Sequence, residues 1–353
     1  MTDDVEVLVG RSGRLGILTL NRPRAINALT HGMVRAVTDA LNHWRGDDSV
    51  LTIAIVGAGE RGLCAGGDVV SLYRDATEGD GSAAAEFWRD EYRMNALIAR
   101  YPKPIVAIQD GLVLGGGIGI SAHASHRVVT ERSRIGFPEV TIGFVPDVGA
   151  SWLLSRAPGQ VGSRLGLTAE SIGAADAIYV GFSDHFVPSD QISALLMALE
   201  TEDPDSAIAA LAQHPGEAPL VAQTPAIDQA FGRDTVGEIL ATLREAGADD
   251  LADGIQAKSP LALAVTRESL RRARDFRDLE EALVSEFRVS THALAAPDFA
   301  EGVRAQLVDK DRNPQWTPAS LADVTADAVA RFFAEPAAGD LTIPDFAPSK
   351  ETA

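Results

Sequence analysis

The sequence predicts an α/β fold in which a strand-rich N-terminal part precedes a mostly helical C-terminal part. Short apolar segments typical of strands alternate with helical patterns up to about residue 149, and helical patterns dominate beyond it. A boundary near residue 215 divides the chain into a core, 1–215, and a C-terminal helical region, 216–353. The proline-rich segment 215–225 is the expected hinge between them.

The individual elements follow from apolar periodicity and from turn residues. Segments 5–9 and 15–20 predict a hairpin that turns across 10–13, and Thr30 is the expected N-cap of a helix over 31–45. The other expected elements are strands at 51–56, 126–130 and 134–137, a strand and turn at 104–111, a Gly-rich loop at 57–68 and a helix at 83–100.

Composition excludes several classes of protein. Hydrophobic residues make up 46% and charged residues 23% of the 353, a balance that suits a globular protein with a sizeable core. The net charge of −19 argues against non-specific binding to nucleic acids or anionic membranes, which needs excess Lys and Arg. The N-terminus lacks a signal-peptide pattern and no apolar segment is long enough to span a membrane, so we expect a cytoplasmic protein. The tail after Pro336 is expected to be loosely held.

The sequence predicts neither a disulfide nor a metal site. Cys64 is the single cysteine, and although His123 and His126 lie close together, nothing near them completes a set of metal ligands. No G-x-S-x-G segment is present, so a serine-hydrolase triad finds no support.

The segment GAGERG at 57–62 matches the G-x-G-x-x-G pattern of dinucleotide-binding proteins and follows a predicted strand. In those proteins a helix opens within the motif, but here LCAGGD follows and prolongs the loop. A plain turn after a strand therefore explains this segment better than a dinucleotide site.

Two further glycine motifs surround Gly67 and Gly116. Gly66 and Gly67 precede Asp68, and three glycines at 115–117 open a helix after an apolar strand. Glycine lets a ligand approach the backbone closely, and a helix N-terminus presents free N–H groups. Two such N–H groups from separate loops form an oxyanion hole. For each motif alone, tight packing against a neighbouring strand is the simpler explanation.

Two carboxylates follow in an apolar segment. Glu139 and Asp147 are eight residues apart, and each lies beside a proline. Apolar surroundings raise the pKa of a carboxyl group and suit it to proton transfer. The residues alone leave two alternatives open: Asp147 could cap the next helix, and Glu139 could be a solvated loop residue.

Together these segments resemble the enoyl-CoA hydratase/isomerase (crotonase) superfamily. The resemblance rests on LNRPRAINAL (20–29), CAGGD (64–68), GGGIG (115–119), PEVTIGFVPDVGAS (138–151) and EGVRAQLVDKDRNPQW (301–316). It implies a crotonase-like core of repeated ββα units, a ββα superhelix, followed by a C-terminal helical region. It also implies that Gly67 and Gly116 donate the hydrogen bonds of an oxyanion hole to a thioester carbonyl.

The resemblance further implies where coenzyme A, a part of the substrate and not a cofactor, would bind. The backbone at 63–67, including Leu63 and Ala65, would line its channel. The basic residues expected near its phosphates, each of which could equally be a solvated surface cation, are Arg22, Arg24 and Lys310. The C-terminal region would complete this site and provide subunit contacts, since homo-oligomers, trimers or hexamers, are typical of the superfamily.

Within the superfamily, the chain departs from the hydratases and resembles the 3-hydroxyisobutyryl-CoA hydrolases of valine breakdown. Hydratases carry a catalytic glutamate where this chain has Gly119, and usually a glycine where it has Asp147. Water addition to a double bond uses two acids, so ordinary hydration should be poor. The hydrolases also resemble this chain in RDEY (89–92), whose Glu91 would line the substrate pocket.

The resemblance thus implies hydrolysis of a short 3-hydroxyacyl-CoA thioester. Glu139 would activate water or attack the carbonyl to give an anhydride. Asp147 would accept a hydrogen bond from the substrate 3-hydroxyl and assist proton transfer to the leaving thiolate. Hydration or isomerisation of an enoyl-CoA is the first alternative, and a non-catalytic acyl-CoA binder is the second.

Overall fold

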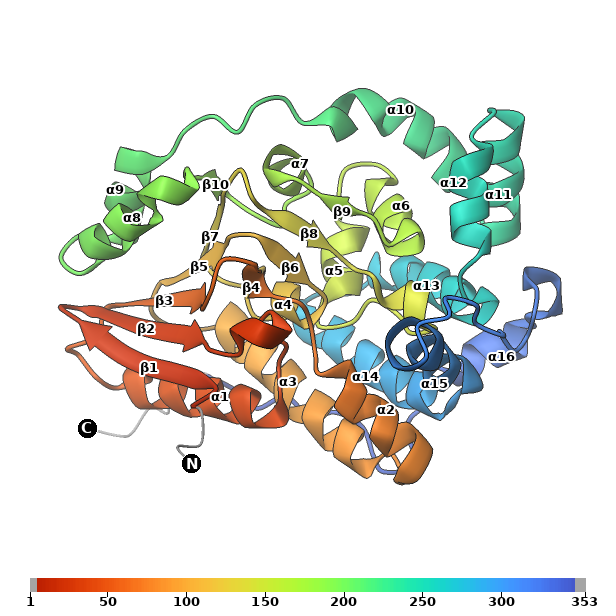
Figure 1. The fold of residues 1–353 in the computed structure, drawn as a ribbon, viewed down its shortest axis with the longest axis horizontal. Helices are drawn as coiled ribbons and strands as arrows, with labels where there is room; N and C mark the ends of the chain where they lie inside the picture. Colours follow the sequence, from red (N-terminus) through yellow and green to blue (C-terminus); the bar gives the residue numbers. More distant parts are fainter. Residues whose placement is uncertain (1–4, 347–353) are drawn as a thin grey trace.

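A computed structural model of the chain describes residues 5–346 and contains two β-sheets with helices around them (Figure 1). The larger sheet has the strand order β1-β2-β3-β5-β7-β10, and the smaller sheet has the order β4-β6-β8-β9. The strands are β1 (Val7–Ser12), β2 (Leu15–Leu20), β3 (Thr52–Gly57), β4 (Gly62–Cys64), β5 (Ile105–Gln109), β6 (Leu112–Leu114), β7 (His126–Val129), β8 (Arg134–Gly136), β9 (Ser171–Ile172) and β10 (His185–Phe186). This architecture confirms the predicted α/β class.

Repeated ββα units build the core. Strands β3, β5 and β7 lie side by side in the larger sheet, and the strand that follows each of them, β4, β6 or β8, belongs to the smaller sheet. The helices after the three strand pairs are α2 (Val69–Glu78) with α3 (Ser82–Ala99), α4 (Gly116–Gly119) and α5 (Ala150–Ser155). The predicted crotonase-like arrangement is therefore confirmed.

The sequence prediction is wrong at two short strands and one turn. The segment predicted as a loop, 57–68, contains β4, and β6 lies between the predicted strand 104–111 and the predicted helix start. Each strand has three residues, too few to show an alternating pattern. The hairpin turns later than predicted because β1 continues through Gly10 to Ser12, and the left-handed residue is Gly13, with φ +55°.

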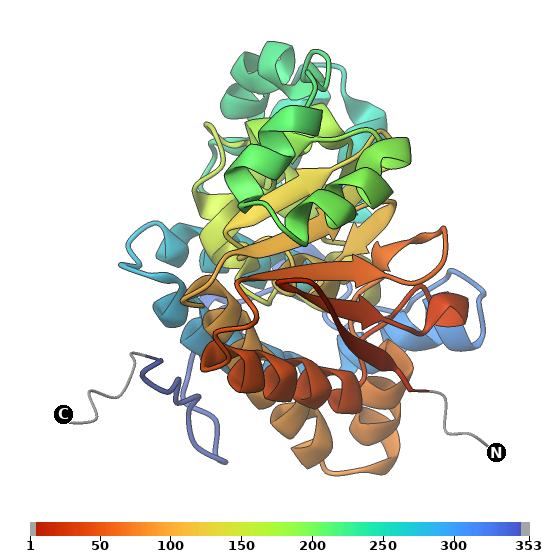
Figure 2. The same cartoon turned by 90° about the vertical axis from the view of Figure 1, so that its left-hand side faces the viewer.

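Helices cover both faces of the larger sheet (Figure 2). Along β5, Ile105 and Ala107 face the main core, whereas Val106 and Ile108 face a second, smaller core. Helix α1 lies on the side of the main core, and α8 and α9 cover the second core. These helices are α1 (His31–Arg45), α8 (Ile192–Leu199) and α9 (Pro204–Leu211).

The predicted start of α1 is confirmed. The Thr30 hydroxyl accepts a hydrogen bond from Met33 N at 3.1 Å, as an N-cap does.

The rest of the chain is mostly helical, as predicted. Its remaining helices are α6 (Val161–Thr168), α7 (Ala174–Tyr179), α10 (Pro219–Phe231), α11 (Val236–Glu245), α12 (Asp249–Gln256), α13 (Pro260–Ala273), α14 (Leu279–Ala295), α15 (Pro297–Val303) and α16 (Ala326–Arg331). Along the whole described part of the chain, the shorter helical turns are η1 (Pro23–Ala25), η2 (Glu139–Ile142), η3 (Ser189–Gln191), η4 (Arg304–Val308) and η5 (Leu321–Asp323). Helix α10 begins inside the predicted hinge, so the non-helical part of this connection is 212–218.

The main core is shared by both parts of the chain. It includes Phe137 from the N-terminal part and Phe287 from the C-terminal part. The division into 1–215 and 216–353 therefore stays a prediction.

The described part of the tail is anchored, which corrects the expectation of a loose tail after Pro336. Arg89 donates to Asp340 O at 2.7 Å, and Arg93 donates to Thr342 O at 2.9 Å. The Leu341 side chain is 5% exposed and joins the main core. The last residues, 347–353, lie outside the described part.

Candidate active site

The carboxyl ends of three strands meet at one cavity. Strand β6 pairs in parallel with both β4 and β8, so the segments that follow these strands lie at one edge of the smaller sheet. A cavity of about 80 Å³ lies there and is closed on its other side by α3. It brings together six of the predicted site residues: Ala65, Gly67, Glu91, Gly116, Glu139 and Asp147.

The glycine side of the cavity presents two backbone N–H groups. Leu29 bonds to Gly66 O at 2.8 Å and to Asp68 N at 2.9 Å, and thereby fixes the backbone on either side of Gly67. A Cβ added at Gly116 would lie 3.3 Å from Gly67 N, so the two glycine backbones are neighbours. Among the described residues, neither N–H group has a hydrogen-bond partner. Both are therefore available to a single ligand oxygen.

Close contacts explain each glycine of the triplet after β6. A Cβ at Gly115 would collide with Glu139 Oε1. A Cβ at Gly116 would lie 2.8 Å from Glu91 Oε1, and one at Gly117 would collide with a backbone carbonyl of β4. Tight packing against a strand thus accounts for Gly117, whereas the first two glycines let carboxyl groups reach the backbone.

Three buried carboxyl groups form the acidic side of the cavity. Glu91, Glu139 and Asp147 are 2%, 8% and 5% exposed. Burial raises the pKa of Glu139 and of Glu91 well above the usual range, and repulsion by Asp147 adds to the effect. Burial also raises the pKa of Asp147 to about 7, although its hydrogen bond from Tyr92 opposes the increase. Some of these groups therefore keep a proton at neutral pH, so the site can both donate and accept one.

The structure contradicts the simpler explanations of the two predicted acids. Glu139 is buried, and its Oε2 atom has no hydrogen-bond partner among the described residues, so it is not a solvated loop residue. Asp147 does not cap α5, since its Oδ2 atom accepts a hydrogen bond from Tyr92 OH at 2.6 Å. Glu286 caps α5 instead and accepts from two backbone N–H groups at the start of that helix, at 2.6 and 2.7 Å.

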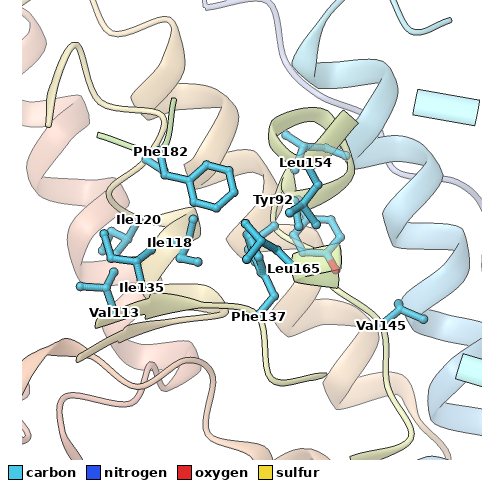
Figure 3. Close-up of a cluster of buried hydrophobic side chains, with 14 of the residues drawn as sticks. Tyr92, Val113, Ile118, Ile120, Ile135, Phe137, Val145, Leu154, Leu165 and Phe182 are labelled. Atoms are coloured by element: carbon cyan, nitrogen blue, oxygen red, sulfur yellow. The ribbon is translucent and has the colours of Figure 1, made fainter. Parts of the chain in front are cut away.

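Two side chains that are not among the predicted site residues hold Asp147. The Tyr92 hydroxyl lies 2.6 Å from Asp147 Oδ2 and 2.8 Å from Ser290 Oγ. The Tyr92 ring belongs to a buried hydrophobic cluster (Figure 3), so its sequence signal is that of an ordinary apolar position on a helix. Ser290 lies on α14, and no local pattern marks it.

Arg22, predicted to contact coenzyme A, is engaged within the fold. Its Nε atom pairs with Glu6 at 3.0 Å, its Nη2 atom pairs with Asp68 at 3.2 Å, and its Nη1 atom donates to Ala28 O at 2.6 Å. These contacts connect the residue before β1 to the loop that carries Gly67. Binding of a phosphate by Arg22 stays a prediction, and its contacts indicate a role in holding that loop.

The other predicted coenzyme A contacts lie outside the cavity. Arg24 and Lys310 are exposed, and Lys310 has a left-handed backbone with φ +60°. Leu63 is 1% exposed in β4 and, unlike Ala65, does not line the cavity. For these residues, too, contact with coenzyme A stays a prediction.

Gly119 has no room for the glutamate of the hydratases. A Cβ at this position would lie 2.6 Å from Val148 Cβ and 3.1 Å from Asn95 Nδ2. Any side chain at Gly119 therefore requires Val148 to shift.

Other site types find no support in the described residues. Within 5–346, no group of three or more His, Cys, Asp or Glu residues is placed to hold a metal ion. His123 bonds to Val148 O, and His126 bonds to Asp205 instead. The glycines at 57–62 lead into β4 and not into a helix, so the dinucleotide pattern lacks its context. No helix in the described part of the chain combines the length and apolar character of a membrane span.

Comparison with known proteins decides the family. Residues 15–333 match the family described as enoyl-CoA hydratase/isomerase. The chain belongs to this family. Within the enoyl-CoA hydratase/isomerase family, it is 37% identical to 3-hydroxyisobutyryl-CoA hydrolase 1 of Arabidopsis thaliana, over 94% of this chain and 92% of that protein. It is 35% identical to the mitochondrial 3-hydroxyisobutyryl-CoA hydrolase of Rattus norvegicus, over 96% and 91%.

Two solved structures of the family are similar to this chain along nearly their whole length. A carnitinyl-CoA dehydratase from Mycobacterium thermoresistibile is 50% identical, with a TM-score of 0.93 over 96% of this chain and 99% of that one. An enoyl-CoA hydratase from Rhodobacter sphaeroides 2.4.1 is 42% identical, with a TM-score of 0.90 over 96% and 100%. The names of the similar proteins thus include both hydrolases and hydratases.

Proposed function

We propose that this protein hydrolyses the thioester bond of a short 3-hydroxyacyl-CoA, with 3-hydroxyisobutyryl-CoA as the substrate. One observation carries the proposal: the buried carboxyl group of Asp147 faces the same small cavity as Glu139 and two free backbone N–H groups. A hydrophobic acyl tail gains nothing from such a carboxylate, whereas a 3-hydroxyl group donates a hydrogen bond to it. The names of the curated relatives agree with this substrate.

The two sides of the cavity divide the reaction between them. The thioester carbonyl accepts hydrogen bonds from the Gly67 and Gly116 N–H groups, which stabilise the negative charge that develops on its oxygen. Glu139 either takes a proton from the attacking water or attacks the carbonyl carbon itself. In the first route a C–O bond forms to water, the C–S bond breaks, and the proton that Glu139 took from the water passes to the coenzyme A thiolate. In the second route a C–O bond forms to Glu139 as the C–S bond breaks. Water then cleaves the C–O bond of this anhydride, which frees the acid, regenerates the Glu139 carboxylate and supplies the proton for the thiolate. The proposed reaction consumes only water and the thioester, so it needs no cofactor, and coenzyme A is part of the substrate.

The size of the cavity favours a short acyl group. Its volume of about 80 Å³ is below the roughly 300–1,000 Å³ of pockets that enclose a whole ligand, so coenzyme A itself must lie outside. Trp88, Phe144 and Phe299 form an aromatic wall, in which the Phe144 ring centroid lies 5.5 Å from each of the other two. This wall bounds the small cavity, so a short acyl group suits it better than a long fatty chain.

Hydration of an enoyl-CoA is the second candidate, because the two similar structures carry the names dehydratase and hydratase. Gly119 and Val148 argue against it, since the space for a second catalytic glutamate is filled. Isomerisation by Glu139 alone would leave Asp147 without a role. A non-catalytic binder would leave Glu139 without one.

Free-thiol release across a panel of acyl-CoA substrates tests the proposal. We expect 3-hydroxyisobutyryl-CoA to react faster than isobutyryl-CoA, which lacks the hydroxyl group. Asp147→Asn should reduce this preference by about 10- to 100-fold, since a hydrogen bond to a charged group contributes roughly 1.5–3 kcal/mol. Asp205→Asn, which changes an exposed aspartate on α9, is the matched control and should keep the wild-type preference. Absence of thiol release, with crotonyl-CoA hydrated instead, would contradict the proposal.

A further inference from the structure

The backbone next to Asp147 is held in an unfavourable conformation. Val148 has φ +57°, in the left-handed region that a β-branched residue rarely adopts. Such a residue costs about 1–3 kcal/mol and persists only where its surroundings enforce it. Val148 is 1% exposed and its Cβ packs against Gly119, so it cannot relax towards solvent. Something around this residue must therefore stabilise the turn.

His123 holds the turn from one side. Its Nε2 atom lies 2.8 Å from Val148 O. A carbonyl oxygen only accepts, so the imidazole donates through an Nε2–H group. Burial lowers the pKa of His123 to about 4, and the ring is therefore neutral in this contact at neutral pH. His123 does not line the cavity, so it cannot contact a substrate bound there.

Glu286 holds the turn from the other side. One carboxyl oxygen accepts from Gly149 N at 2.6 Å, and the other accepts from Ser151 N at 2.7 Å and from Ser151 Oγ at 2.5 Å. Glu286 is 2% exposed on α14 and does not line the cavity either. Val148 is thus fixed from both sides: His123 donates to its carbonyl oxygen, and Glu286 accepts from the N–H group of the next residue.

We propose that His123 and Glu286 are positioning residues, which keep Val148 left-handed and thereby direct the Asp147 carboxylate into the cavity. Tyr92 contacts one oxygen of that carboxylate, but the direction of the side chain from the backbone is set by the turn. The proposal rests on the proposed function for the role of Asp147 towards the 3-hydroxyl group. The turn itself does not depend on which acyl group is bound.

Kinetics of His123 variants test the proposal. His123→Leu removes the donor, and we expect kcat for 3-hydroxyisobutyryl-CoA to fall by about 10- to 100-fold, as a misplaced catalytic group does. The fall should be several-fold smaller for isobutyryl-CoA, which has no hydroxyl group for Asp147 to bind. His123→Gln keeps an N–H donor and should restore most of the activity. His126→Leu is the matched control, since His126 bonds to Ser125 and Asp205 away from the cavity, and it should behave as wild type.

A double-mutant cycle with Val148→Gly tests the turn itself. Glycine adopts φ +57° without strain, so the destabilisation and the loss of rate caused by His123→Leu should be smaller in the Val148→Gly background. Thermal unfolding of the four proteins measures this coupling without any substrate. Glu286→Gln should show the same dependence on Val148.

The outcomes separate the two proposals. The positioning role would be overturned if His123→Leu reduced kcat equally for 3-hydroxyisobutyryl-CoA and isobutyryl-CoA. It would also be overturned if the effects of His123→Leu and Val148→Gly on thermal unfolding were fully additive. Absence of thiol release by the wild-type protein would overturn the proposed hydrolase function instead. In that case thermal unfolding of the four proteins of the double-mutant cycle still tests whether His123 holds the turn. Coupling between the two substitutions supports this role, and additive effects contradict it.

Discussion

The glycine side and the acidic side of the cavity differ in how the chain holds them. Gly67 and Gly116 present backbone N–H groups, and nearby backbone contacts fix them. The acidic side presents side chains from separate elements, and Asp147 depends on Tyr92 and on Ser290 of α14. A preorganised pair of N–H groups suits any thioester. The acidic side, in contrast, places buried carboxyl groups together at a cost in stability, and in the proposed function it selects the substrate and the reaction.

The largest effect should come from the acidic side. Glu139→Gln preserves the shape of the side chain but removes the proton acceptor or nucleophile, so we expect thiol release to fall by about 10²- to 10⁴-fold. The glycine side is unchanged, and a titration with the substrate should therefore still show binding.

An exposed carboxyl group serves as the control for this change. Glu245→Gln alters the last residue of α11 and should keep the wild-type rate. If Glu139→Gln bound the substrate and kept full thiol release, another group would have to perform the reaction.

The glycine side should show the next largest effect, and its two members should differ. A Cβ at Gly116 would lie 2.8 Å from Glu91 Oε1 and 3.3 Å from Gly67 N, between the two donors. We expect Gly116→Ala to reduce kcat by about 10²- to 10³-fold, as loss of an oxyanion-hole donor does. A Cβ at Gly67 would meet only the Phe87 ring, at 3.6 Å, an ordinary contact. Gly67→Ala should therefore be several-fold milder, and equal losses in the two variants would contradict this geometry.

The same contrast explains how much of the site the sequence predicts. Gly67, Gly116, Glu139 and Asp147 lie in short motifs, and the structure places all four at one cavity. Tyr92 contacts Ser290, which lies 198 residues further along the chain, and no local pattern in the sequence reveals a contact between residues so far apart.

The fold was predictable to a similar extent. Helices with a wide apolar face, such as α1 and α3, produce a long periodic signal and lie within a residue of their predicted bounds. Strands β4 and β6 have three residues each and owe their existence to pairing with each other. The anchored tail at Asp340 depends on arginines of α3 and α14 far away in the sequence.

A smaller effect should appear in the pH dependence of the acidic side. The hydrogen bond from Tyr92 lowers the pKa of Asp147, which burial raises to about 7. In the proposed function, ionised Asp147 accepts a hydrogen bond from the substrate hydroxyl, so kcat/KM for 3-hydroxyisobutyryl-CoA should rise with pH around 7 in the wild type. Tyr92→Phe should move this rise to higher pH and reduce the rate at pH 7 by about two- to tenfold, since one pKa unit corresponds to a tenfold change.

The control for Tyr92 is a tyrosine that bonds elsewhere. Tyr101 donates to Leu41 O at 2.6 Å, outside the cavity, so Tyr101→Phe should leave the pH midpoint unchanged. A midpoint that stays at the wild-type pH in Tyr92→Phe would show that Asp147 does not govern the rise.

The smallest effect should be on the pH dependence of stability. The buried acids should make the protein less stable as pH rises, whereas a carboxylate whose pKa is lowered by folding makes a protein more stable as pH rises. Burial raises the pKa of Glu286 to about 8 in the folded protein, against about 4.3 for an unfolded chain. Between these values the folded state binds more protons than the unfolded state, so the free energy of unfolding must fall as pH rises. The raised pKa values of Glu91, Glu139 and Asp147 act in the same direction.

We therefore expect Tm to decrease from pH 5.5 to 8.5, and Glu286→Gln to reduce this decrease by a few degrees, as a change of about 1 kcal/mol does. Glu245→Gln should leave the slope unchanged. A wild-type Tm that increases over this range would mean that the buried acids are ionised in the folded protein. Burial of these carboxyl groups would then not make the folded state less stable at high pH, and the acidic side would not differ from the glycine side in this respect.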